Sequence, residues 1–288
     1  MRLSEVAIEP YIEPVLAGGG LLATSPELPM KRLLCEGAPD IFQIAPVHRR
    51  AEQGRLHSEG FHLIEWYRRG VDERAVRADV EQLIDAVFID FGREPVSSWS
   101  CQGFLSLLEE TTSLKLEGTE DAATLLEIVP SSWRVDVPEG MPSHAHDLYA
   151  WSALLTAWSD AALDPWLARQ PGGVHIVDYP APLAALAQIG AARAGTGSHG
   201  HRFESYVGGI ELANGYHELR DPVEQRRRFE AVAGLREGHG LEPLPMPEHF
   251  LHALERLPEC AGAALGFERL LMLATGSQSL AQIQLHSD

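Results

Sequence analysis

Gly209 to Leu219 has the sequence Gly-Ile-Glu-Leu-Ala-Asn-Gly-Tyr-His-Glu-Leu, the most informative segment of this chain. The pattern predicts a β-strand, but Glu211, Asn214 and Glu218 occupy positions that would be apolar in an ordinary strand. Carboxylate oxygens are suitable ligands for a divalent metal ion. The stretch therefore predicts a strand that carries functional side chains.

A second dense segment, Gly262 to Leu273, follows later in the chain. There Arg269 interrupts an apolar run at the point where a strand is expected to give way to a helix. An arginine at a helix start, combined with metal-binding carboxylates, is suited to a nucleotide triphosphate. Together the two segments predict an ATP-using enzyme.

The composition is that of a globular, acidic protein. The 288 residues are enough for one large domain or a domain with an insertion, and 45% hydrophobic residues allow a substantial core. Lys and Arg number 23 against 41 Asp and Glu, which gives a formal net charge of −18. A polyanion such as tRNA would meet long-range repulsion, so nucleic acid is disfavoured as a partner.

The cysteines and the N-terminus indicate a cytoplasmic protein. Cys35, Cys101 and Cys260 are far apart and form no C-x-x-C pair, as is typical of a reducing compartment. No apolar run is long enough to span a membrane. Residues 1–5 lack the basic-then-apolar order of a signal peptide.

Hydrophobic patterning predicts an α+β fold with an antiparallel sheet. Strands are expected at 41–44 and 61–67, paired as a hairpin whose long polar loop covers 49–58. An apolar stripe predicts a helix over 72–90. Three further predictions are a mostly helical insertion at about 95–170, a mobile loop at 195–200 and a final strand and helix over 261–274.

Two more helices are expected before that final pair. Asp221 with Glu224 forms a capping box, and Pro222 occupies the first helical position, which predicts a helix to about Arg236. A second helix is expected over 246–257.

The chain resembles the catalytic core of class II lysyl-tRNA synthetases and, more closely, their stand-alone paralogues that attach β-lysine to elongation factor P. The similar segments follow the family's order: 24–34, 49–67, 179–189, 203–229 and 262–273. The resemblance implies one catalytic domain over 1–288, with a six- or seven-stranded antiparallel sheet flanked by helices and no anticodon-binding domain.

The resemblance also implies a reaction. The carboxylate of lysine or β-lysine would attack ATP in the presence of Mg²⁺, and the resulting adenylate would acylate a lysine of elongation factor P. In the family an N-terminal helix and strand form the dimer interface, and only Ile8 to Val15 resemble this segment. The sequence leaves homodimer formation open.

Two arginines are implied to contact the phosphates. Arg49 matches the family's α-phosphate arginine, although Arg50 and Arg55 lie close and a solvated loop charge is the alternative. Arg269 is expected at the γ-phosphate, the alternative being an exposed residue paired with Glu268. The other residues implied to bind ATP are Glu52, His57, Phe61 and Glu211.

Glu211 and Glu218 are the candidate metal ligands. They are seven positions apart, so a regular strand would point them to opposite faces, and a bulge or turn at Asn214-Gly215 is expected to correct this. The alternative is two surface carboxylates on an edge strand.

The amino-acid pocket is also assigned through the resemblance. Glu65 follows an apolar strand segment, where an unpaired charge would be costly, so it is favoured over Glu27 as a ligand for a substrate ammonium group. The remaining residues implied to bind the amino acid are Ser25, Tyr67, Asn214, Glu218 and Ala264.

The arginine loop departs from the family. A glutamate that holds the adenine amino group is replaced by Ala51, with Glu52 one step further on, and Glu59-Gly60-Phe61 stands for Pro-Glu-Phe. A second hypothesis is therefore a non-catalytic relative that binds an amino acid or a partner protein. A third is the same chemistry with another acceptor.

Overall fold

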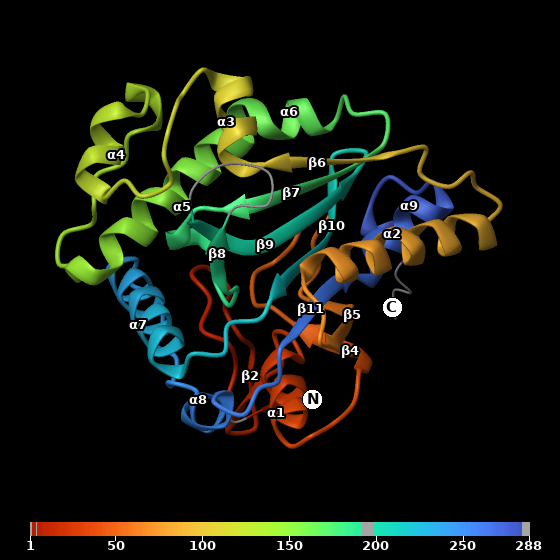
Figure 1. Ribbon diagram of the computed structural model, residues 1–288, viewed down its shortest axis with the longest axis horizontal. Coiled ribbons are helices and arrows are strands. Elements are labelled where there is room, and N and C mark those ends of the chain that lie inside the picture. Colours follow the sequence, from red (N-terminus) through yellow and green to blue (C-terminus); the bar gives the residue numbers. More distant parts are fainter. Residues whose placement is uncertain (1, 4, 192–197, 284–288) are drawn as a thin grey trace.

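The computed structural model describes residues 2–3, 5–191 and 198–283. Its main sheet has eight strands in the order β4-β5-β11-β10-β9-β7-β6, with β8 paired to β9. The strands are β4 (Ile41–His48), β5 (Gly60–Arg69), β6 (Trp99–Gly103), β7 (Gly173–Tyr179), β8 (Ile189–Ala191), β9 (Ser198–Val207), β10 (Ile210–His217) and β11 (Cys260–Gly266). Helices flank the sheet (Figure 1), so the predicted α+β class is confirmed.

The sheet differs in two respects from the one that the resemblance implied. It has eight strands rather than six or seven, and β6 runs parallel to β7 while the other pairs are antiparallel. Parallel neighbours need a crossover connection. Here the crossover contains α3 (Phe104–Thr112), α4 (Ala122–Ile128), α5 (His146–Trp158) and α6 (Asp164–Leu167).

These crossover helices lie in the segment predicted to be a mostly helical insertion. A π-helical turn, Ser159–Leu163, joins α5 to α6, and short 3-10 turns occur at Ser131–Trp133 and Ser143–Ala145. The helices pack around Trp151 and Trp158, which are fully buried against β7. The treatment of this segment as an insertion in a single domain stays a prediction.

Helix α2 (Glu73–Asp90) covers one face of the sheet. Its stripe of Val76, Val80, Ile84 and Phe88 is buried against β9, β10 and β11, and the Asp72 side chain caps its first turn. The predicted helix over 72–90 is thus confirmed, as is the β4–β5 hairpin. The opposite face of β5, β10 and β11 lines a cavity.

The remaining helices complete the frame around that cavity. They are α1 (Glu27–Cys35), α7 (Pro222–Gly238), α8 (Glu248–Leu254) and α9 (Phe267–Thr275). Asp221 caps α7 as predicted, but Glu224 does not complete the capping box, because its carboxylate accepts hydrogen bonds from Arg227 and Arg228 instead. The helix predicted over 246–257 is shorter, and the final strand and helix are confirmed.

Smaller elements occupy the N-terminal part. Strands β1 (Arg2–Leu3), β2 (Leu16–Ala17) and β3 (Gly20–Leu22) form a separate small sheet, and 3-10 turns occur at Ala181–Leu183 and Leu280–Gln282. Of the loop predicted at 195–200, residues 195–197 lie outside the described residues, whereas 198–200 belong to β9. Within the described ranges, no helix is long and apolar enough to cross a membrane.

Candidate functional site

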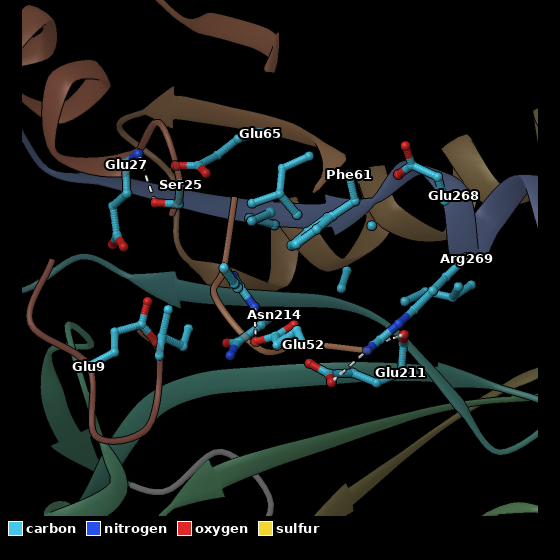
Figure 2. Close-up of a pocket in the computed structure, with 18 of the residues that line it drawn as sticks. Glu9, Ser25, Glu27, Glu52, Phe61, Glu65, Glu211, Asn214, Glu268 and Arg269 are labelled. Atoms are coloured by element: carbon cyan, nitrogen blue, oxygen red, sulfur yellow. Dashed lines mark hydrogen bonds and ion pairs between the residues drawn. The ribbon is translucent and has the colours of Figure 1, made fainter. Parts of the chain in front are cut away.

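One cavity of about 270 Å³ collects every site residue that the sequence predicted. These are Ser25, Glu27, Arg49, Glu52, His57, Phe61, Glu65, Tyr67, Glu211, Asn214, Glu218, Ala264 and Arg269. Figure 2 shows Ser25, Glu27 and Glu65 gathered at one end, and Glu211, Glu268 and Arg269 at the other. The site therefore has two chemically different ends.

Arg269, near the start of α9, is fixed at the second end by a set of acceptors. Its guanidinium donates to the Glu211 carbonyl oxygen at 3.0 Å and to the Leu56 carbonyl oxygen at 3.2 Å. Its Nη2 lies 2.9 Å from His57 Nε2. Burial and the neighbouring Arg269 charge lower the pKa of His57, so the ring is neutral and accepts this hydrogen bond.

The alternative for Arg269, a surface pair with Glu268, does not describe the structure. The Glu268 carboxylate accepts hydrogen bonds from the His62 backbone N–H at 2.9 Å and approaches the His62 ring at 2.8 Å. This anchors Glu268 to β5 and leaves Arg269 facing the cavity.

Arg49 is the one arginine of its loop that lines the cavity, among the described residues. Arg50 binds Glu13 at 2.9 Å and Arg55 reaches the Gln278 carbonyl oxygen, both outside the cavity. The Arg49 guanidinium lies over the Phe61 ring, 5.1 Å from its centroid, which holds the charge in place by a cation–π contact. Of the three arginines in this loop, Arg49 is therefore the one placed to contact a ligand in the cavity.

The loop that lacks the family's glutamate has a turn of its own. Ala51 adopts a left-handed backbone conformation with φ of 64°, and its N–H donates to a Glu59 carboxylate oxygen at 2.8 Å. The next residue, Glu52, lines the cavity 3.8 Å from the Arg49 guanidinium. The Glu52 carboxylate is thus present in the cavity, although the preceding position has alanine where the family has glutamate.

The expected irregularity in β10 exists, but in a different place. The register with β9 shifts between Glu211 and Ala213, rather than at Asn214-Gly215. The extra residue brings Glu211 to the same cavity as Asn214 and Glu218. The turn prediction was therefore right in kind and wrong in position.

The two predicted metal ligands have different partners. A Glu211 carboxylate oxygen lies 3.5 Å from Arg269 Nη1, whereas a Glu218 carboxylate oxygen lies 2.5 Å from Lys31 Nζ. Both residues line one cavity, but their carboxylates pair with different cationic side chains. A shared metal between Glu211 and Glu218 stays a prediction.

Glu204 is a candidate metal ligand that was not predicted from the sequence. It lies on β9, one strand away from Glu211, and its carboxylate accepts hydrogen bonds from Arg202 and Tyr206 at 2.5 Å each. Burial, followed by the nearby Glu204 charge, raises the pKa of Glu211. The alternation of Arg202, Glu204 and Tyr206 on one face of a strand was the available signal.

Lys31 is a second residue near the site that was not predicted from the sequence. Its ammonium is buried between Glu27 at 2.6 Å and Glu218 at 2.5 Å, and it lies 5.8 Å from the ring centroids of Tyr67 and Tyr216. Burial disfavours its charge, but the two carboxylates outweigh this and raise the pKa of Lys31. The spacing of four from Glu27 on α1 was the available signal.

Glu65 lies at the same end with its charge less well compensated. One carboxylate oxygen accepts a hydrogen bond from Tyr67 at 2.6 Å, and the other has no hydrogen-bond partner among the described residues. Burial, followed by the nearby Glu27 charge, raises the pKa of Glu65 to about 8. The end thus has three carboxylates, Glu27, Glu65 and Glu218, for one ammonium.

Small residues on β11 make room for this arrangement. A Cβ on Gly262 would lie 2.3 Å from the Tyr67 ring, so glycine is required for Tyr67 to reach Glu65. Ala264 is paired with Glu65 on one side and Asn214 on the other. The Ser25 hydroxyl accepts a hydrogen bond from the Glu27 N–H at 3.1 Å, which fixes the start of α1.

Comparison with known proteins identifies a consistent set of relatives. Residues 9–287 match the family of tRNA synthetases class II (D, K and N). The chain is 36% identical over 276 residues to the elongation factor P--(R)-beta-lysine ligase of Vibrio cholerae, which covers 95% of this chain and 80% of that protein. The ligases of the same name from Vibrio campbellii and Salmonella arizonae are 37% and 36% identical, covering 95% and 91% of this chain and 80% and 75% of their own lengths.

Proposed function

Because the chain belongs to the class II tRNA synthetases of the D, K and N group, we propose that it is an ATP-dependent ligase. It would activate lysine or β-lysine as an adenylate and transfer the acyl group to a lysine of elongation factor P, as its relatives' names describe. The observation that carries the proposal is the cavity with arginines at one end and surplus carboxylates at the other.

The carboxylate end selects an amino acid with a second ammonium group. Lys31 is one ammonium for the three carboxyl groups of Glu27, Glu65 and Glu218, so a substrate ammonium is favourable there, with Glu65 giving up its proton on binding. The uncommitted oxygen of Glu65 is the candidate acceptor for that ammonium. A neutral amino acid would supply no ammonium group to pair with the Glu65 carboxylate.

The arginine end suits the phosphates of ATP. In the proposed first step, a carboxylate oxygen of the amino acid attacks the α-phosphorus, and the bond from that phosphorus to the bridging oxygen breaks to release pyrophosphate. Arg49 would stabilise the charge that develops on the α-phosphate, and Arg269 would hold the γ-phosphate. Phe61 and His57 keep the two guanidinium groups in position.

In the proposed second step the acceptor's amine attacks the carbonyl carbon of the adenylate. A carbon–nitrogen bond forms, the bond to the phosphate oxygen breaks, AMP leaves, and the amine loses a proton. An unprotonated lysine amine is required as the nucleophile.

Glu204 is an alternative to Glu218 as the second magnesium ligand beside Glu211, although its carboxylate pairs with Arg202. Burial, followed by the charge of Glu204 on the neighbouring strand, raises the pKa of Glu211, and a divalent cation would favour its charged form. When bound, the ion would neutralise phosphate charge. Glu218 already has a cation partner in Lys31.

Pyrophosphate exchange across the standard amino acids and β-lysine tests the proposal. We expect exchange with lysine or β-lysine in the presence of ATP and Mg²⁺, followed by transfer to purified elongation factor P. A folded protein that supports exchange with none of these amino acids would overturn the assignment. Exchange without transfer to elongation factor P would point to another acceptor.

The non-catalytic hypothesis rested on the alanine at position 51 and on the N-terminal segment, of which only 8–15 resembles the family. Glu52 in the cavity favours retained adenine recognition, and both arginines face the cavity. Calorimetry with ATP separates the hypotheses, because the non-catalytic hypothesis holds only if magnesium-dependent ATP binding is absent.

The three cysteines are free, consistent with the proposed cytoplasmic location, and homodimer formation stays a prediction.

A further inference from the structure

A second cluster of metal-ligating side chains lies outside the cavity. Glu73, His201 and His217 each offer one ligand atom, and these atoms lie within 4.8 Å of one another. All three side chains are buried, and they come from α2, β9 and β10. The ligase chemistry proposed above uses none of them.

The sheet places this cluster on the face that α2 covers. Tyr216 and Glu218 line the cavity, so His217 between them points to the opposite face, where Glu73 begins α2. Tyr216 is paired with Arg202, so the next pair along the strands brings His217 opposite His201. Their rings stack with centroids 5.9 Å apart and 12° between planes.

His217 is the residue that points to a ligand. It is 6% exposed, and among the described residues neither of its ring nitrogens has a hydrogen-bond partner. Its Nδ1 lies 3.9 Å from a Glu73 carboxylate oxygen. Two atoms bound to one zinc ion, each at about 2.1 Å, can be at most about 4.2 Å apart, so this pair is within reach of a shared ion.

The surroundings supply one outer contact of the kind that ligating histidines usually have. His201 Nε2 lies 3.0 Å from the Ala191 carbonyl oxygen, and His217 Nε2 lies 3.7 Å from a Glu259 carboxylate oxygen. A carbonyl partner of this kind orients an imidazole ligand around a metal ion, whereas the Glu259 oxygen is too far from His217 for a hydrogen bond.

We propose that Glu73, His201 and His217 bind one divalent transition-metal ion of the zinc class. Two imidazoles and one carboxylate suit zinc or cobalt, whereas magnesium and calcium prefer oxygen ligands alone. The ion would join the first residue of α2 to β9 and β10, and so brace the strand segment that carries Tyr216 and Glu218. It is separate from the magnesium ion proposed in the cavity.

Zinc chloride alone, without ATP or amino acid, is the probe for this site. The protein is stripped with a chelator and titrated with Zn²⁺ by calorimetry, and Co²⁺ is followed by visible absorption. We expect one tight equivalent of Zn²⁺, a higher melting temperature, and a Co²⁺ spectrum with nitrogen ligation at low coordination number. Absence of tight Zn²⁺ binding by the wild-type protein would overturn the proposal.

Variants locate the ion. His217→Ala, His201→Ala and Glu73→Gln are each expected to weaken Zn²⁺ binding by about a hundredfold or more, exceeding the effect typical of outer partners. His249→Ala removes a histidine that is 74% exposed and should leave the Zn²⁺ affinity unchanged, as should a double variant of the proposed magnesium ligands, Glu204→Gln with Glu211→Gln. Loss of Zn²⁺ affinity in the Glu204/Glu211 double variant, or its persistence in the three cluster variants, would contradict the assignment. The Co²⁺ spectrum of the wild-type protein is an independent test, because it does not depend on whether the variants fold.

Discussion

The Lys31 ammonium nitrogen lies 2.5 Å from a Glu218 carboxylate oxygen, and both side chains are closed off from solvent. The same ammonium lies 2.6 Å from Glu27. A buried lysine side chain thus pairs, from behind the cavity lining, with two of the carboxylates that we assign to the proposed substrate. This arrangement explains how three glutamates are kept close together in the absence of a bound amino acid.

Replacing Lys31 with Met is expected to destabilise the fold strongly. Removing one partner of a buried ion pair leaves an uncompensated charge, which costs about 3–5 kcal/mol. Denaturant unfolding at neutral pH measures this free energy. Arg226→Met is the control, because the Arg226–Glu248 pair is largely exposed and should contribute about 0–1 kcal/mol. Equal effects of the two variants would contradict the structural role of Lys31.

Changing Glu65 to Gln should weaken the binding of lysine-type substrates. The variant retains an oxygen to accept the Tyr67 hydrogen bond but loses the charge that faces the substrate ammonium. The expected loss is roughly 2–5 kcal/mol of binding free energy. Calorimetry with lysine and with ATP measures both affinities, and that for ATP should hardly change. A wild-type preference for a neutral amino acid would refute this substrate assignment.

The affinity for lysine should rise with pH up to about 8. The pKa of Glu65 is raised to about 8, so below this pH the carboxyl is protonated, and binding an ammonium must release that proton. One pH unit corresponds to about 1.4 kcal/mol, so the slope should approach tenfold per unit between pH 6 and 8. Dissociation constants measured over this range test the prediction. Glu65→Gln should reduce the slope to the part contributed by Glu218, whose pKa burial also raises to about 8, and a flat wild-type profile would rule out this titration.

Replacing Arg269 with Ala should slow pyrophosphate exchange rather than abolish amino-acid binding. Losing a preorganised donor to a charged transition state costs about 10²–10³ in kcat. Arg55→Ala is the matched control, since Arg55 is exposed and contacts the Gln278 carbonyl oxygen outside the cavity. Similar losses in both variants would show that general positive charge, not position, matters.

Glu204→Gln and Glu218→Gln distinguish the two candidate metal pairs. We expect Glu204→Gln to raise the Mg²⁺ concentration for half-maximal exchange by about tenfold or more, because a carboxylate ligand is lost. Glu218→Gln should instead weaken amino-acid binding, since its partner is Lys31. Magnesium titrations of the two variants provide the test, and the opposite outcome would restore the Glu211–Glu218 pair.

Local patterns were sufficient for most of the elements. The stripe on α2, the Asp221 cap of α7 and the polar loop between β4 and β5 are features of neighbouring residues, and each was predicted correctly. The parallel direction of β6 was not predictable in this way. It depends on the crossover through the helices that follow, which no local period of the sequence encodes.

The bulge in β10 shows the limit of this reasoning inside a single strand. The seven-residue spacing of Glu211 and Glu218 required some correction of parity, and Asn214-Gly215 was the obvious local candidate. The register shift instead occurs between Glu211 and Ala213, because pairing with β9 decides where the extra residue is accommodated.

The fold family, most helices and strands, and the chemical types of side chain in the cavity could be predicted from local patterns and motif order. Which charges are partners depends on the folded chain: Lys31 pairs with Glu218, Glu204 lies on the strand next to Glu211, and His217 faces Glu73. The physical reason is that ion pairing and desolvation depend on distances of a few ångströms. Chain folding sets those distances between residues that are remote in the sequence.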